Sequence, residues 1–193
     1  MTKTEKILAL HKDFVRKTNI GLKKTATQAV FGDGNPASEI VFIGEAPGKK
    51  EDLEGRPFIG AAGKFLAEML AVVKLKREDI YITNIVKYRP PDNRDPLPKE
   101  IKACAPWLRA ELKEIGPKLI VFLGRHSMNH FFPTEKISVV HGKLLQKKIP
   151  GFPTEFFFPL YHPAAALYNG GMRETLIKDF KKIPKILKKI KQT

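Results

Sequence analysis

Short apolar runs alternate with amphipathic stretches along this chain. Four of the runs are rich in β-branched and aromatic residues and have the length of buried strands: 40–43, 80–84, 119–123 and 156–161. Between them, apolar residues recur at helical spacing over 61–73 and over 98–115. Strand–helix–strand alternation with continuously apolar strands is typical of a parallel sheet that helices cover on both faces. The pattern therefore predicts an α/β fold.

The two ends of the chain have helical patterns of their own. The opening stretch MTKTEKILALHKDF has the pattern of an amphipathic helix, and it is charged too early for a secretory signal. Residues 173–193 are predicted to form a Lys-rich helix interrupted by Pro184. For its lysines, a solvated face is favoured over a contact with phosphate. A hairpin-like stretch over 139–149 turns at residues 150–153 into the fourth strand. With no repeat and no low-complexity linker, residues 1–193 are predicted to form a single domain.

Composition narrows the range of partners. Thirty-five Lys and Arg against twenty Asp and Glu give a net charge of +15, which favours a polyanion such as nucleic acid, although a charge for solubility would look the same. Cys104 is the one cysteine, which excludes an internal disulfide and an iron–sulfur site held by cysteines of one chain. No apolar run approaches the roughly 18–20 residues of a membrane span. We expect a cytoplasmic protein without a membrane partner.

Unusual residues follow each predicted strand. Ligands of an open parallel sheet bind beyond the carboxyl ends of its strands. The first strand runs into Gly44-Glu45-Ala46-Pro47-Gly48, a tight turn that matches neither a P-loop nor a dinucleotide fingerprint. Asn84 ends the second strand, Gly124 follows the third and His162 follows the fourth. A glycine-rich loop, a carboxamide and an imidazole are thus expected in one crevice.

Each of these residues also has a plain structural interpretation. Glu51 and Asp52 follow the first loop closely and could simply start a helix, because acids suit the positive end of the helix dipole. Phe58 stands between proline and glycine in a polar loop, where it could stack on a ligand or fill the core. Asn84 could close a turn, and a lone histidine such as His162 is more often structural than catalytic.

The motifs taken in order resemble one known family. The runs VFIGEAPGKKEDLEGRPFIGAAGKFLAEML, YITNIVKYRPPDNRDPLPKEIKACAPWL, LIVFLGR and YHPAA are similar to the uracil-DNA glycosylase superfamily, most of all to its thermostable, iron–sulfur family-4 branch. The resemblance implies a three-layer α/β/α fold with a four-stranded parallel sheet. It also implies a monomeric, nucleoid-associated base excision repair enzyme that hydrolyses uracil from DNA and leaves an abasic site. A weak or inactive DNA-binding member of the same fold is the alternative.

By this resemblance, four residues bind the base. Gly44 and Ala46 border the uracil, Phe58 stacks on it, and Asn84 reads its edge. A neutral amide can donate to uracil O4 and accept from N3–H, whereas cytosine presents the opposite pattern. An enzyme of this kind flips the base out of the duplex before it acts.

Three further residues match catalytic positions of the family. Glu45 or Glu51 would orient the attacking water, and the sequence leaves open which of them does so. His162 would donate a hydrogen bond to uracil O2 as anionic charge grows on the leaving base.

The segment after the histidine matches the family's duplex-entering loop. The residues predicted to contact DNA are Pro163, Ala164, Leu167 and Tyr168. The family often continues Leu-Arg-Asn-Pro, whereas this chain has Leu-Tyr-Asn-Gly-Gly, so insertion into the duplex is expected to be weaker.

The cluster cysteines of family 4 are the main departure. They would fall near Lys17 and Ile20, at Tyr88 and at Cys104, and only the last is a cysteine. Because a cluster needs about four ligands, neither a cluster nor any other metal or cofactor is expected. An apolar plug is expected in its place, formed by Ile20, Leu22, Tyr88 and Trp107.

Overall fold

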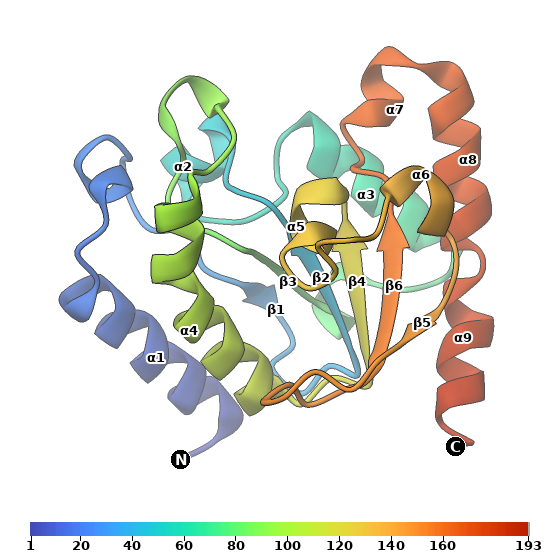
Figure 1. Ribbon diagram of the computed structural model, residues 1–193, viewed down its shortest axis with the longest axis horizontal. Helices are drawn as coiled ribbons and strands as arrows, with labels where there is room; N and C mark the ends of the chain where they lie inside the picture. Colours follow the sequence, from blue (N-terminus) through green and yellow to red (C-terminus); the bar gives the residue numbers. More distant parts are fainter. Residues whose placement is uncertain (193) are drawn as a thin grey trace.

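A mixed sheet, with six strands in residues 1–192, lies at the centre of the computed structural model, which describes those residues (Figure 1). Its inner strands all run parallel, in the order β3 (Tyr81–Asn84), β2 (Ile40–Gly44), β4 (Leu119–Leu123) and β6 (Phe156–Leu160). The short strands β1 (Asp33–Gly34) and β5 (Leu145–Gln146) extend the two edges antiparallel. The predicted parallel sheet is confirmed as the inner part of a wider one. Two-residue edge strands carry no periodicity, so the sequence does not predict them.

Helices cover both faces of the sheet, as Figure 1 shows. Successive residues of a strand point to opposite faces, and in β2 this places Val41 and Ile43 in one apolar cluster and Ile40 and Phe42 in the other. The first cluster includes side chains of α1 (Lys3–Lys17), α4 (Pro98–Ile115) and α5 (Arg125–Asn129). The second includes side chains of α3 (Ala61–Val72), α8 (Gly170–Phe180) and α9 (Ile183–Ile190). The three-layer α/β/α architecture is therefore confirmed.

Local signals fix the ends of the longer helices. Thr2 and Glu5 cap α1 reciprocally, each side chain accepting a hydrogen bond from the backbone N–H of the other. Pro98 begins α4, where a missing N–H costs nothing, and Gly116 ends it with a left-handed φ of 65°. These signals explain why the predicted range 98–115 agrees with α4.

The C-terminal segment is two helices rather than one interrupted helix. The side chain of Asn169 accepts hydrogen bonds from the backbone N–H groups of Gly171 and Met172, so α8 begins before the predicted residue 173. Pro184 lies in the first turn of α9, and Thr193 lies outside the described residues. Figure 1 shows α9 beside the amino ends of the strands, away from the edge where ligands bind. This position favours the solvated-face interpretation of its lysines.

The remaining elements are short. They are η1 (Gly21–Lys24), α2 (Lys49–Glu54), η2 (Arg77–Asp79), η3 (Pro91–Asn93), α6 (Ile137–Val140) and α7 (Ala165–Tyr168). The predicted hairpin is present as β5 and β6, but the beginning of its stretch is helix α6. Within residues 1–192, no helix is both long enough and apolar enough to cross a membrane.

Candidate active site

Three of the predicted residues lie in contact at the carboxyl ends of β2 and β3. Gly44 and Asn84 are paired in register at the ends of these strands. A Cβ placed on Gly44 would lie 2.4 Å from Asn84 Oδ1 and 2.6 Å from the ring of Phe58, so only glycine fits there. The ring of Phe58 is in turn 5.8 Å from that of His162, between centroids. The glycine, the carboxamide and the imidazole that the strand ends predict in one crevice therefore all lie around the ring of Phe58, which only the family resemblance places there.

The loop that carries Phe58 is held by hydrogen bonds from both sides. Phe58 has a left-handed φ of 52°, a conformation that needs support from its surroundings. Oε1 of Glu51 accepts hydrogen bonds from the backbone N–H groups of Ile59, at 2.9 Å, and Gly60, at 2.8 Å. On the other side, the guanidinium of Arg77 donates to the carbonyl of Phe58 at 3.0 Å. Phe58 is 7% exposed, so its ring belongs to the core and also forms a wall of the site.

Glu51 and Asp52, the acidic residues in the first turn of α2, have different partners. Glu51 lies in the first turn of the helix, as its structural interpretation expects, and also holds the Phe58 loop through Oε1. Asp52 is buried and accepts hydrogen bonds from the backbone N–H and the hydroxyl of Thr27. Asp52 is therefore structural, and Glu51 acts on the site by positioning its loop.

Asn84 presents an unsatisfied group to the site. The residue is 2% exposed, and among the described residues its Oδ1 has no hydrogen-bond partner. A buried polar atom without a partner carries a desolvation penalty, and such atoms in native proteins are commonly completed by a ligand or water. Its position beside Gly44 and Phe58 leaves this oxygen available to a ligand.

His162 is held in one tautomer. The backbone N–H of Ala164 donates to its Nδ1 at 3.1 Å, so the neutral ring carries its proton on Nε2. Burial lowers the pKa of His162 to about 4, with a contribution from the charge of His126 and an opposing one from Glu51. The imidazole is therefore neutral at pH 7 and offers an N–H donor.

Glu45 is the other carboxyl group predicted to orient water, and its surroundings perturb its pKa. Its Oε1 is buried and, within residues 1–192, has no hydrogen-bond partner. Burial raises its pKa to about 7, the charge of Asp95 raises it further, and Arg125 opposes the rise. A carboxyl group of this kind is suited to receive or orient a proton-bearing ligand near neutral pH.

One group of side chains has the composition of a metal site. Glu45, Asp95 and His126 place potential ligand atoms within 4.8 Å of one another. However, Nε2 of His126 accepts a hydrogen bond from Nε of Arg125 at 3.0 Å, which puts a positive charge beside the group and disfavours a cation. Asp95 and His126 are not predicted as site residues, because neither lies at a sequence spacing that would mark it.

The segment after His162 is exposed only in part. Pro163 is buried, and Ala164 is partly buried with its N–H bound to the histidine. Leu167 is 42% exposed and Tyr168 is 91% exposed, both on the short helix α7. The exposed apolar surface of this segment therefore comes from Leu167 and Tyr168.

Comparison with known proteins assigns this chain to a family. Residues 31–191 match the family model described as the uracil DNA glycosylase superfamily. The chain belongs to this superfamily. Curated relatives agree with the family-4 resemblance of the motifs. Over 177 residues the chain is 48% identical to the type-4 uracil-DNA glycosylase of Archaeoglobus fulgidus, covering 89% of the chain and 88% of the relative.

Two further type-4 uracil-DNA glycosylases match almost the whole chain. The Saccharolobus solfataricus protein is 47% identical over 187 residues, covering 93% of this chain and 86% of the relative. The Thermotoga maritima protein is 37% identical over 193 residues, covering 96% and 97%. The predicted membership of the superfamily, with the type-4 proteins as relatives, is confirmed.

The residues at the cluster positions do not fit the iron–sulfur cluster that the family-4 resemblance implies. Cys104 is buried, and burial raises the pKa of its thiol, which keeps it protonated. Ile20 and Tyr88 lie in the same apolar cluster as Cys104, and Lys17 pairs with Asp13. Because thiolates are the usual ligands of such clusters, this set supplies too few.

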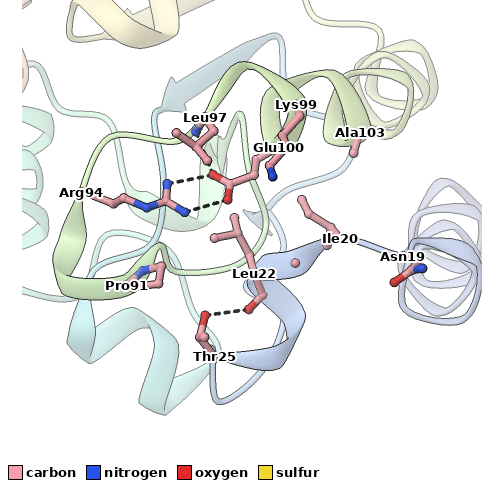
Figure 2. Close-up of a pocket in the computed structure, with 11 residues that line it drawn as sticks. Asn19, Ile20, Leu22, Thr25, Pro91, Arg94, Leu97, Lys99, Glu100 and Ala103 are labelled. Carbon is pink, nitrogen blue, oxygen red and sulfur yellow. Dashed lines mark hydrogen bonds and ion pairs between the residues drawn. The ribbon is translucent and has the colours of Figure 1, made fainter.

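Apolar contacts and an ion pair connect these segments instead. The ring of Phe14 lies 5.6 Å from that of Tyr88 and 5.6 Å from that of Trp107, between centroids. The residues expected in the apolar plug (Ile20, Leu22, Tyr88 and Trp107) all pack in or against one apolar cluster. Figure 2 shows the adjoining pocket of about 390 Å³, where Arg94 binds Glu100 through two hydrogen bonds of 2.7 and 2.9 Å.

Proposed function

We propose that this protein excises uracil from DNA by hydrolysing the N-glycosidic bond, leaving an abasic site for base excision repair. The observation that carries the proposal is the buried, unpartnered Oδ1 of Asn84 between Gly44 and Phe58, in a chain of the uracil DNA glycosylase superfamily. The type-4 relatives are named for this activity.

Base recognition follows from the chemistry of Asn84. Its Oδ1 accepts from uracil N3–H and its amide N–H donates to O4, which leaves cytosine mismatched at both positions. Stacking on Phe58 adds about 1–3 kcal/mol without regard to the identity of the base. Because uracil within a duplex is out of reach, the base is flipped into the site, at a cost of a few kcal/mol.

Bond cleavage uses the neutral imidazole and one carboxylate. Breaking the bond produces a cationic sugar and an anionic uracil, and Nε2–H of His162 stabilises the anion at O2. We assign the water to Glu45, because Oε1 of Glu51 already accepts two hydrogen bonds from the Phe58 loop. As an anion, Glu45 orients the water, accepts its proton and favours the cationic sugar.

The surroundings of the site support action on DNA. Leu167 and Tyr168 are suited to fill the space that the flipped base vacates, and a net charge of +15 attracts the phosphate backbone. Since Cys104 is the only cluster position that carries a thiol, we infer that the protein works without an iron–sulfur cluster, as a monomer in the cytoplasm on nucleoid DNA. Stoichiometric iron with a brown colour in purified protein would contradict the first of these inferences.

One assay tests the function directly. A labelled oligonucleotide with a single uracil is incubated with the protein and then treated with alkali, and a thymine-containing oligonucleotide serves as control. We expect strand cleavage at uracil alone. Binding of the uracil oligonucleotide without cleavage would point instead to an inactive DNA-binding member of the family.

A further inference from the structure

A buried ion pair lies directly behind the uracil site and has no part in the chemistry described above. Lys87 and Glu111 are 2% and 1% exposed, and Lys87 Nζ lies 2.7 Å from Glu111 Oε2. Lys87 follows β3 by three residues, and Glu111 lies on α4. The pair therefore joins the end of the strand that carries Asn84 to the helix layer on one face of the sheet.

The ammonium group of Lys87 has three acceptors. Besides Glu111, it donates to the hydroxyl of Thr83 at 2.5 Å and to the main-chain carbonyl of Asn84 at 3.0 Å. An ammonium group has three N–H donors, so the available donors are all used. One of these bonds ends on the backbone of the residue proposed to read the base.

Glu111 is held equally firmly. Its Oε1 accepts from the hydroxyl of Tyr81 at 2.8 Å and lies 3.3 Å from Nε2 of His11, and its Oε2 also accepts from the hydroxyl of Thr83 at 3.0 Å. Burial alone would raise the pKa of Glu111, but Lys87 and His11 hold it down at about 2. The carboxylate thus stays charged and keeps Lys87 in place.

The anchored segment also touches the water-bearing loop. The backbone N–H of Ile85 donates to the carbonyl of Gly44 at 3.0 Å, and that of Val86 donates to the carbonyl of Glu45 at 3.1 Å. The residues between Asn84 and Lys87 therefore connect the base-reading strand to the loop of Glu45. A buried ion pair adds little stability over an apolar pair of the same size, so its presence at this point calls for another explanation.

We propose that the Lys87–Glu111 pair is a positioning device that fixes the backbone of Asn84 and so aims its carboxamide at the uracil. The proposal rests on the proposed function, because it takes Asn84 to be the base-reading residue. Oδ1 of Asn84 has no partner of its own among the described residues, so the aim of the amide depends on its backbone. Lys87 and Glu111 touch no reacting atom and are positioning residues.

A double-mutant cycle tests this coupling. Single-turnover excision of uracil is measured for the parent, Lys87→Met, Asn84→Ala and the combination of both. We expect Lys87→Met to be slower by about 10²-fold, since misplacement by about 1 Å can cost that much. If Lys87 acts through Asn84, adding Lys87→Met to Asn84→Ala slows excision by no more than about 2-fold. Affinity for abasic-site DNA, which has no base to read, should stay within about 2-fold of the parent.

Leu112→Ala is the matched control. Leu112 is fully buried and directly follows Glu111 on α4, but its role is apolar packing. The change should lower the melting temperature without slowing excision per folded molecule. If Leu112→Ala slows excision as much as Lys87→Met does at equal fraction folded, general loosening of α4 explains the result and the proposal is overturned.

The other outcomes distinguish a failure of the base-reading role of Asn84 from a failure of the positioning role of Lys87. If Asn84→Ala excises uracil at the parental rate, the proposed base-reading role fails. If Asn84→Ala is slow but Lys87→Met is as fast as the parent, or if their effects multiply, only the positioning role fails. Should Lys87→Met not fold, the uncharged pair Lys87→Met with Glu111→Gln takes its place, and a parental rate in that variant overturns the proposal.

Discussion

Replacing the carboxyl group of Glu45 by an amide should slow the enzyme and stabilise it at the same time. In the folded protein the pKa of Glu45 is raised from 4.5 to about 7, first by burial and then by the charge of Asp95. The ionised form that the reaction needs is therefore the form that the folded state disfavours. Glu45→Gln keeps the shape of the side chain and removes its charge at every pH.

The sign and size of the stability effect follow from proton linkage. Below about pH 4.5, Glu45 is protonated in both states and the fold incurs no penalty. As pH rises from 4.5 to about 7, the unfolded chain ionises first and the folded state loses stability relative to it. At about 1.4 kcal/mol for each pKa unit, the loss reaches up to about 3 kcal/mol and is complete above pH 7. Glu45→Gln should regain up to this amount at about pH 8 and gain nothing at about pH 4.

The rate of uracil excision should rise with pH as Glu45 ionises, over the same pH range in which the folded state loses stability. Single-turnover excision by the parent should fall about tenfold for each pH unit below 7 and level off above it. At about pH 8, Glu45→Gln should be slower by about 10²–10⁴-fold, the usual contribution of a positioned acid or base.

Two measurements and one control check this reasoning. Excision rates are measured from about pH 5 to 9, and urea unfolding is measured at about pH 4 and pH 8. Glu54→Gln, which changes an exposed carboxyl group of α2, should alter neither the rate nor the stability. A Glu45→Gln protein that is as active as the parent, or less stable than the parent at pH 8, would refute the role assigned to Glu45.

Three further substitutions test the rest of the site. His162→Ala should slow excision by about 10²–10³-fold, with a loss constant from pH 6 to 9 because the imidazole is already neutral there; a parental rate would remove its role as a donor. Gly44→Ala should slow excision by at least about 10²-fold with little change in DNA affinity, since the new Cβ would collide with Asn84 and Phe58; unimpaired excision would mean that the crevice can widen. Tyr168→Ala should slow excision from duplex DNA several-fold more than from single strands, and equal losses would exclude Tyr168 as a wedge.

The sequence predicts the centre of the fold because its signals there are local and repeated. Residues 119–123 are continuously apolar and agree with β4, and the helix predicted over 98–115 agrees with α4. The edge strands β1 and β5 are two residues long, and their pairing depends on neighbours that lie far away in the sequence. The early start of α8 depends on the capping side chain of Asn169, which precedes two glycines that hide the helical pattern.

The site could be predicted as a set of residues but not as a set of contacts. Strand ends and family motifs point to Phe58, Asn84 and His162, and the structure brings these together. The hydrogen bonds of Glu51 to the Phe58 loop, by contrast, depend on a left-handed backbone at Phe58 that no spacing reveals. The open choice between Glu45 and Glu51 can be argued only once these bonds are known.

Other contacts in this protein join the segments that the cluster cysteines would connect in family 4, which explains how the fold can depart from the cluster-binding pattern. In family 4 the cluster cysteines would connect the N-terminal segment, the exit of β3 and α4. In this protein Phe14 of α1 packs on Tyr88 and Trp107, and His11 of α1 meets Glu111, which binds Lys87. The three segments are thus joined twice, by an apolar contact and by a buried ion pair. Because the ion pair also bonds to the backbone of Asn84, support for the fold and alignment of the base-reading residue depend on the same few side chains.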